Sequence, residues 1–125
     1  MITVTTLEKP YLCLVTNGVY QLHADTTSKI GGGDAGFRPH DLLAAALGSC
    51  LAITMKKFAA EQKIPVQSIS VGVELDKSIP DKTVFCKRIS IQGDISEEDR
   101  KRLYEAANTC AVQQTLSRQL EFIVE

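Results

Sequence analysis

The pattern of apolar and polar positions divides the first third of the chain into three strand-like stretches. Residues 2–7 and 11–16 are rich in Val, Ile, Thr and Tyr, and residues 19–24 alternate between two faces, which is typical of strands. Asn17-Gly18 separates the second stretch from the third and favours a two-residue hairpin turn, because both residues tolerate positive φ. We therefore predict an antiparallel meander of three strands.

A long apolar stretch follows and predicts the central helix. Pro39 suits the first helical position, where its missing N–H costs nothing, and Asp41 suits the positive end of the helix dipole. Pro65 disfavours helical geometry at the residue before it, so the helix should end at about Lys63. Residues 42–55 carry no charge and place apolar side chains on every face, which predicts a helix enclosed by the rest of the protein.

The connection before this helix, residues 25–37, contains a run of three glycines. No Gly-Lys-Ser/Thr follows the run and no parallel-strand unit precedes it, so a phosphate-binding loop is not supported. We expect a flexible linker or a lid at this position.

A second hairpin is predicted after the helix. Residues 68–76 alternate strictly, with apolar side chains on one side, and residues 83–92 return after a turn at 79–82. The alternation of the returning strand shifts near Arg88, as it would at a β-bulge. Both strands should pack one face against the core.

Two helices and a last strand complete the prediction. Ser96, with an acidic residue three positions later, marks the start of an amphipathic helix over about 95–108. A short helix should cover 110–116, and the alternation of residues 119–124 predicts a final strand. The order β-β-β-α-β-β-α-α-β predicts an α+β fold in a single domain spanning residues 1–125.

Composition limits the classes of function. The chain is 44% hydrophobic and 23% charged with a formal net charge of -1, which argues against a disordered segment and against a basic nucleic-acid-binding protein. No fully apolar run reaches about 18 residues, and the amino-terminal residues do not resemble a signal peptide, so we expect a cytoplasmic protein without a membrane segment. His23 and His40 are too few and too poorly spaced against the cysteines to predict a metal site.

The four cysteines are the candidate chemical groups. Cys13, Cys50, Cys86 and Cys110 are widely spread without a Cys-x-x-Cys pair, which argues against a disulfide scaffold or a zinc ribbon. Each is open to a plain structural role as a small buried hydrophobe, and we assign that role to Cys13 and Cys86. Cys50 and Cys110 are candidates for peroxide chemistry. In this chemistry a thiolate attacks a peroxide, and a second thiol converts the resulting sulfenic acid to a disulfide.

The positions of this pair predict how each thiol is stabilised. Cys50 lies mid-helix, gains little from the helix dipole, and needs a cationic or hydrogen-bonding neighbour. Cys110, near a helix start, should be stabilised as a thiolate by terminal N–H groups.

Segments 39–50 and 110–116, each with one of these cysteines, resemble the two cysteine motifs of the OsmC/Ohr family of osmotically inducible and organic hydroperoxide resistance proteins. The resemblance implies antiparallel sheets wrapped around a long central helix, in an intertwined homodimer with active sites at the interface. It also implies a peroxidase of organic hydroperoxides without cofactor or metal. Cys50 would be the peroxidatic cysteine, Cys110 would resolve its sulfenic acid, and a dithiol reductant would reopen the disulfide.

The sequence also departs from the better-known peroxidases of this family. Those peroxidases have an arginine in the amino-terminal region that stabilises the thiolate, and a glutamate after the proline that orients this arginine. Here no arginine precedes Arg38, and His40 occupies the position of the glutamate. Arg38, His40 and Asp41 are therefore the candidates for activating the thiolate in a different arrangement. The second motif has Ala111 and Gln113 where proline and histidine are common. Two other functions stay open: a noncatalytic protein that binds a small apolar ligand, and a thiol–disulfide exchanger that does not act on peroxides.

Overall fold

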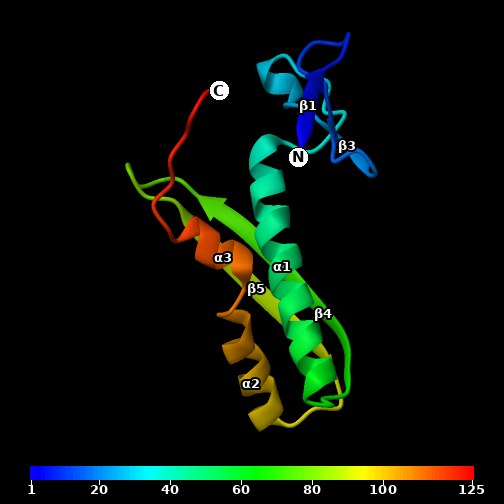
Figure 1. The fold of residues 1–125 in the computed structure, drawn as a ribbon, viewed down its shortest axis with the longest axis vertical. Helices are drawn as coiled ribbons and strands as arrows, with labels where there is room; N and C mark the ends of the chain where they lie inside the picture. The colour runs from blue at the N-terminus through cyan, green and yellow to red at the C-terminus, as the bar shows by residue number, and fades with distance from the viewer. The chain divides into compact units, whose positions relative to one another are not determined.

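The computed structural model describes residues 1–125, and the chain forms two compact units, Met1–Leu43 and Ala44–Glu125 (Figure 1). The predicted α+β class is confirmed, because antiparallel sheets accompany one long helix. The single domain expected from the sequence stays a prediction.

The first unit contains the predicted three-stranded antiparallel meander. Its strands are β1 (Thr3–Thr6), β2 (Cys13–Thr16) and β3 (Gln21–Ala24), with β2 in the middle. They are shorter than the apolar pattern suggested. Pro10 has no N–H to donate to the sheet, and Tyr11 has φ of 66°, outside the range of strands, so β2 begins only at Cys13.

The hairpin between β2 and β3 differs in detail from the prediction. Only Gly18 has positive φ, 94°, and the loop spans four residues, from Asn17 to Tyr20. The Asn17 side-chain oxygen accepts hydrogen bonds from the N–H groups of Val19, at 2.9 Å, and Tyr20, at 2.7 Å. This side chain stabilises a wider turn than the expected two-residue turn.

The glycine-rich connection is held by a buried carboxylate. Asp25 accepts hydrogen bonds from the backbone N–H groups of Thr26 at 2.7 Å, Ala35 at 3.1 Å and Gly33 at 3.2 Å. A single 3-10 turn, η1 (Ser28–Ile30), lies within the loop. These hydrogen bonds hold the connection in place, whereas the sequence predicted a flexible linker or a lid.

Helix α1 (Pro39–Glu61) begins at the predicted residue and ends two residues before the predicted end. Lys63 has φ of 57°, and the Ile64 N–H donates to the Ala59 carbonyl oxygen at 2.8 Å. This is the geometry of a Schellman-type cap with lysine at the position that glycine usually occupies.

A long hairpin of β4 (Val66–Asp76) and β5 (Val84–Gly93) forms the sheet of the second unit. The pairing is regular along most of its length, and its one register shift falls between the first and third residues of β4. The bulge expected near Arg88 is therefore wrong, and the irregularity lies opposite Gly93, whose φ of 148° suits glycine. The face that packs against the core carries Ile69, Val71, Val73, Phe85 and Ile89.

Two helices follow the hairpin. Helix α2 (Glu97–Ala107) begins as predicted, because the Ser96 hydroxyl oxygen accepts a hydrogen bond from the Asp99 N–H at 3.1 Å. Helix α3 (Ala111–Leu116) has Cys110 as its amino-terminal flanking residue.

The predicted strand at 119–124 is absent. These residues form no regular structure, and Phe122 and Val124 are 90% and 98% exposed. A strand needs a neighbouring strand to pair its backbone N–H and C=O groups, and this chain offers the segment none. The alternation of apolar side chains is therefore present in the sequence without the pairing that would turn it into a strand.

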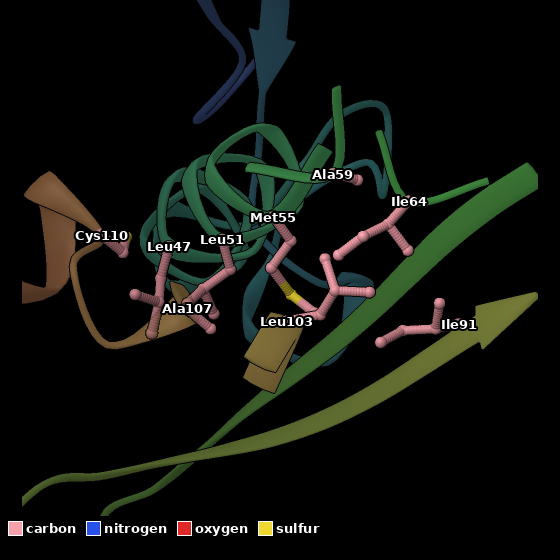
Figure 2. Close-up of a cluster of buried hydrophobic side chains, with 9 residues drawn as sticks. All are labelled: Leu47, Leu51, Met55, Ala59, Ile64, Ile91, Leu103, Ala107 and Cys110. Atoms are coloured by element: carbon pink, nitrogen blue, oxygen red, sulfur yellow. The ribbon is translucent and has the colours of Figure 1, made fainter. Parts of the chain in front are cut away.

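The core of the second unit forms along one side of α1 (Figure 2). Four residues of α1, spaced four apart, make a buried stripe. At Gly48 the helix lies so close to β4 that an added Cβ would be 3.3 Å from Val73 Cγ2. The buried cluster consists of Leu47, Leu51, Met55, Ala59, Ile64, Ile91, Leu103, Ala107 and Cys110.

Only one face of α1 is covered within this chain. Ile53, between two residues of the buried stripe, is 60% exposed, so the prediction of a helix enclosed on all sides is wrong for a single chain. An 18-residue window of α1 also has a mean hydropathy of 1.5, which is enough by length and composition for a membrane span. This property was not predicted from the sequence. The core helix of a folded domain meets the same criterion.

Candidate functional site

Cys50 and Cys110, 60 residues apart in sequence, lie together in the second unit. Cys50 is half-buried on α1, and Cys110 is fully buried where the chain passes from α2 into α3. Figure 2 shows Cys110 at the edge of the cluster near Leu47, one turn before Cys50. Both thiols are free, and Cys50 packs against the buried cluster that contains Cys110.

The surroundings of Cys50 favour its thiolate. A hydrogen bond from the Cys110 thiol lowers the pKa of Cys50 most, followed by one from the Val112 backbone N–H. Partial burial opposes this effect, and the Thr54 hydroxyl and the Ala111 N–H lower the pKa further. The net result is a Cys50 pKa below its ordinary value, reached through hydrogen bonds alone.

The surroundings of Cys110 act in the opposite direction. Burial raises the pKa of the Cys110 thiol most, and the hydrogen bond to Cys50 raises it further. The N–H groups of Gln113 and Val112 lower it only in part. The expectation that helix-terminal N–H groups would favour a thiolate at Cys110 is therefore wrong: burial outweighs them there, and at Cys50 two N–H groups of the same turn lower the pKa.

Arg38, His40 and Asp41 lie at the start of α1. The Arg38 guanidinium donates to both carboxylate oxygens of Asp41, at 2.9 and 3.1 Å, and the Arg38 N–H donates to Asp41 Oδ2 at 3.0 Å. The side-chain hydrogen bond from Arg38 lowers the pKa of Asp41, and the same bond raises the pKa of Arg38. His40 is exposed. The two charged groups close the first turn of the helix, and a role in thiolate activation stays a prediction.

A pocket of about 330 Å³ opens on the elements that hold the cysteines. Leu47 contributes from α1, one turn before Cys50, and Gln113 contributes from α3, next to Val112, whose N–H lowers the pKa of Cys50. Lys87 of β5 donates from Nζ to Gln113 Oε1 at 2.9 Å. The complete lining is Leu47, Thr83, Phe85, Lys87, Gln113, Leu116 and Ser117.

Two residues near the cysteines were missed from the sequence. Thr54 is four positions after Cys50, a spacing that places both side chains on the same helix face and could have drawn attention to it. Lys87 is a charged residue in the apolar row of β5, which was a readable signal. The helix-terminal N–H groups gave no sequence signal for Cys50, because their direction depends on tertiary packing.

The remaining candidate groups lie apart from this arrangement. Cys86 is exposed on β5, on the face opposite Phe85 and Lys87, and Cys13 is half-buried in β2 of the first unit. No group of three or more His, Cys, Asp or Glu side chains is arranged to hold a metal ion.

Comparisons with known proteins identify the fold. The structure is similar to that of an organic hydroperoxide resistance protein OsmC from Legionella pneumophila, with 19% identity, coverage of 94% of this chain and 89% of that chain, and a TM-score of 0.70. An OsmC-like protein from Mycoplasma pneumoniae gives 21% identity, 93% and 85% coverage, and a TM-score of 0.73. An organic hydroperoxide resistance protein from Elizabethkingia anophelis gives 20% identity, 93% and 86% coverage, and a TM-score of 0.68.

No curated protein matches the sequence. The family profile described as OsmC-like protein matches residues 31–125, which is most of the chain and includes both cysteine motifs. The resemblance inferred from those motifs is therefore confirmed, and this chain belongs to the OsmC-like protein family.

Proposed function

We propose that the protein is a cysteine-based peroxidase that reduces organic hydroperoxides, with Cys50 as the attacking thiol and Cys110 as the resolving thiol. The observation that carries the proposal is that two neighbouring thiols have pKa values shifted in opposite directions by their shared surroundings. The pKa of Cys50 is lowered and that of Cys110 is raised. A peroxidase needs this asymmetry, because only the thiolate attacks the peroxide, whereas the second thiol acts afterwards.

The reaction is balanced by these two groups and one external reductant. The Cys50 thiolate attacks one oxygen of ROOH, the O–O bond breaks, and the alkoxide takes a proton to leave as ROH. Sulfur loses two electrons and becomes the sulfenic acid Cys50–SOH. The Cys110 thiol then attacks the Cys50 sulfur, a disulfide forms and water leaves. A dithiol reductant restores both thiols, which suits the cytoplasmic location expected from the sequence.

The chain lacks the amino-terminal arginine of the better-known peroxidases, and we propose that hydrogen-bond donors stabilise the Cys50 thiolate instead. The Val112 and Ala111 N–H groups and the Thr54 hydroxyl lower the pKa of Cys50. Such donors stabilise a thiolate in the way a cation does, although each contributes less. A contribution of Arg38 to the activation of Cys50 stays a prediction, and the peroxidase rate of Arg38→Met tests it.

The direct test is consumption of cumene hydroperoxide by the reduced protein without added reductant. The wild type should consume one equivalent, and Cys50→Ser should consume none. Cys110→Ser should consume peroxide and accumulate a sulfenic acid that dimedone traps. Cys86→Ser is the matched control, because Cys86 is exposed on the opposite face of β5, and it should behave as the wild type. Wild-type thiols that form a disulfide with dithiol partners but ignore peroxides would favour a thiol–disulfide exchanger instead.

We also propose a homodimer in which a second copy covers the bare apolar surfaces. Ile53 is exposed on α1, and the alternating segment 119–124 has no strand to pair with. In the first unit Ile2, Val19 and Tyr20 are exposed as well. Apolar side chains of this number seldom stay in water on a stable monomer.

Light scattering at micromolar concentration tests the dimer. We expect twice the mass of one chain, and Ile53→Lys should shift the protein toward monomer. Lys101→Glu, at an exposed position of α2, is the control and should leave the mass unchanged. A stable wild-type monomer would contradict the proposal.

A further inference from the structure

Lys87 occupies an unusual position for a charged residue. It follows Phe85 and precedes Ile89 on the same face of β5, and both of these neighbours pack against the buried core. Across the hairpin Lys87 pairs with Val73, which also packs against the core. Lys87 is therefore an exposed charged residue within an apolar row, and it lines the same pocket as Phe85.

Gln113 fixes this ammonium group at the pocket. Its side-chain oxygen accepts the hydrogen bond from Lys87 Nζ at 2.9 Å, and its amide NH₂ keeps two donors for another partner. Thr83 and Ser117 add hydroxyl groups to the lining. Lys87 is the one charged residue of the lining, so the pocket wall carries a positive charge with hydrogen-bond donors beside it and no carboxylate in the lining.

The rest of the pocket suits a hydrocarbon group. Leu47, Phe85 and Leu116 supply apolar walls, and the volume of about 330 Å³ is within the range of small-ligand sites. The apolar wall reaches Leu47, one helical turn from Cys50. A ligand with its hydrocarbon part against this wall would extend from Lys87 toward Leu47, on the turn of α1 that precedes Cys50.

We propose that Lys87 and Gln113 form a carboxylate-recognition site, which makes hydroperoxides that carry a carboxylate at the end remote from the O–O group the preferred substrates. This inference rests on the proposed peroxidase function. An ammonium group and an amide donor together give a carboxylate a charge-assisted hydrogen bond and a neutral one. Lys87 is a specificity residue in this account and takes no part in breaking the O–O bond.

The test compares cumene hydroperoxide with its para-carboxylate derivative. The ratio of kcat/KM for the acid to that for the neutral compound should exceed one in the wild type and fall about fivefold in Lys87→Met, as expected for loss of a partly exposed charged contact. Lys87→Arg should keep most of the ratio. Lys101→Met removes an equal charge from the exposed face of α2 and should keep the wild-type ratio. A ratio that is the same in the wild type and Lys87→Met would overturn the inference.

A binding measurement separates this inference from the peroxidase proposal. 4-Isopropylbenzoate and neutral 4-isopropylbenzamide contain no peroxide, and their binding can be followed by NMR shifts of the Gln113 and Leu116 amides. The benzoate should bind more tightly than the benzamide, and Lys87→Met should remove the difference. Equal binding of the two would overturn the inference. If neither hydroperoxide reacts but the benzoate binds preferentially, the peroxidase proposal fails and carboxylate recognition stands.

Discussion

The two compact units are stabilised in different ways. The second unit holds all nine residues of the buried hydrophobic cluster, drawn from α1, the β4–β5 hairpin, α2 and the start of α3. The first unit buries only Ala24 and Asp25, and its glycine-rich loop is held by backbone hydrogen bonds to a carboxylate. The paired cysteines lie in the unit with the core. Close packing there can hold two thiols in a fixed arrangement, which a polar loop alone does less well.

The largest expected effect is on the second unit. Met55 is fully buried in the cluster, and Met55→Ala should lower the free energy of unfolding by about 2–5 kcal/mol, because it removes apolar contacts and leaves a cavity. Urea unfolding followed by circular dichroism measures the change. Ser70→Ala, on the exposed face of β4, should stay within about 0.5 kcal/mol of the wild type. An equal change in the free energy of unfolding for the two substitutions would contradict the claim that the buried cluster stabilises the second unit.

Asp25→Asn should act on the first unit alone. The amide loses the negative charge that holds three backbone N–H groups, so hydrogen exchange of residues 26–36 should become faster. Exchange at Leu51 and Leu103 in the second unit should not change. Glu8→Gln, at an exposed position, is the control. Faster exchange in both units would show that their stabilities are not separate.

The same carboxylate predicts a dependence on pH. The Thr26 N–H lowers the pKa of Asp25 most, and the N–H groups of Ala35 and Gly33 add to this, although burial opposes them. A lowered pKa in the folded state means that the unfolded state binds more protons, so the stabilisation is present above the unfolded value of about 4 and is lost as the pH falls below it. In that acid range, hydrogen exchange of the loop amides should accelerate relative to their intrinsic exchange rates in the wild type. In Asp25→Asn this acceleration should be absent.

A smaller effect is expected at the site. Thr54→Val removes one hydroxyl donor to Cys50, so the pKa of Cys50 should rise and its alkylation by iodoacetamide at pH 7 should slow about threefold. In the wild type, the midpoint of the pH dependence of this rate should lie below the pKa of a free thiol. In Thr54→Val the midpoint should lie at higher pH. Ser49→Ala is the control, because the Ser49 hydroxyl donates to the Ala46 carbonyl oxygen. An unchanged midpoint in Thr54→Val would remove this donor from the account.

The smallest expected effect is at the end of α1. Lys63 adopts φ of 57°, a region that glycine enters without cost, so Lys63→Gly should raise the free energy of unfolding by about 0.5 kcal/mol. Thermal unfolding measures the gain. Lys57→Gly, in the helix interior, should instead lower the stability by about 1 kcal/mol.

Sequence reasoning succeeded where local chemistry decides the structure. The start of α1 at Pro39 and the Ser96 cap of α2 depend on a few neighbouring residues, and both were found. The strand at 119–124 and the enclosure of α1 were wrong for one chain, because both require surfaces that local patterns do not supply. The cysteine pair was named from two motifs, but the Val112 and Ala111 N–H groups that lower the pKa of Cys50 come from α3 and could not be inferred from spacing.

Peptide mass spectrometry after one equivalent of cumene hydroperoxide tests the central claim most directly. The account predicts a single new disulfide, between Cys50 and Cys110, formed together with one equivalent of the alcohol. Cys13 and Cys86 should stay free and alkylable. Two intact thiols at 50 and 110, or a disulfide that joins either of them to Cys13 or Cys86, would contradict the account.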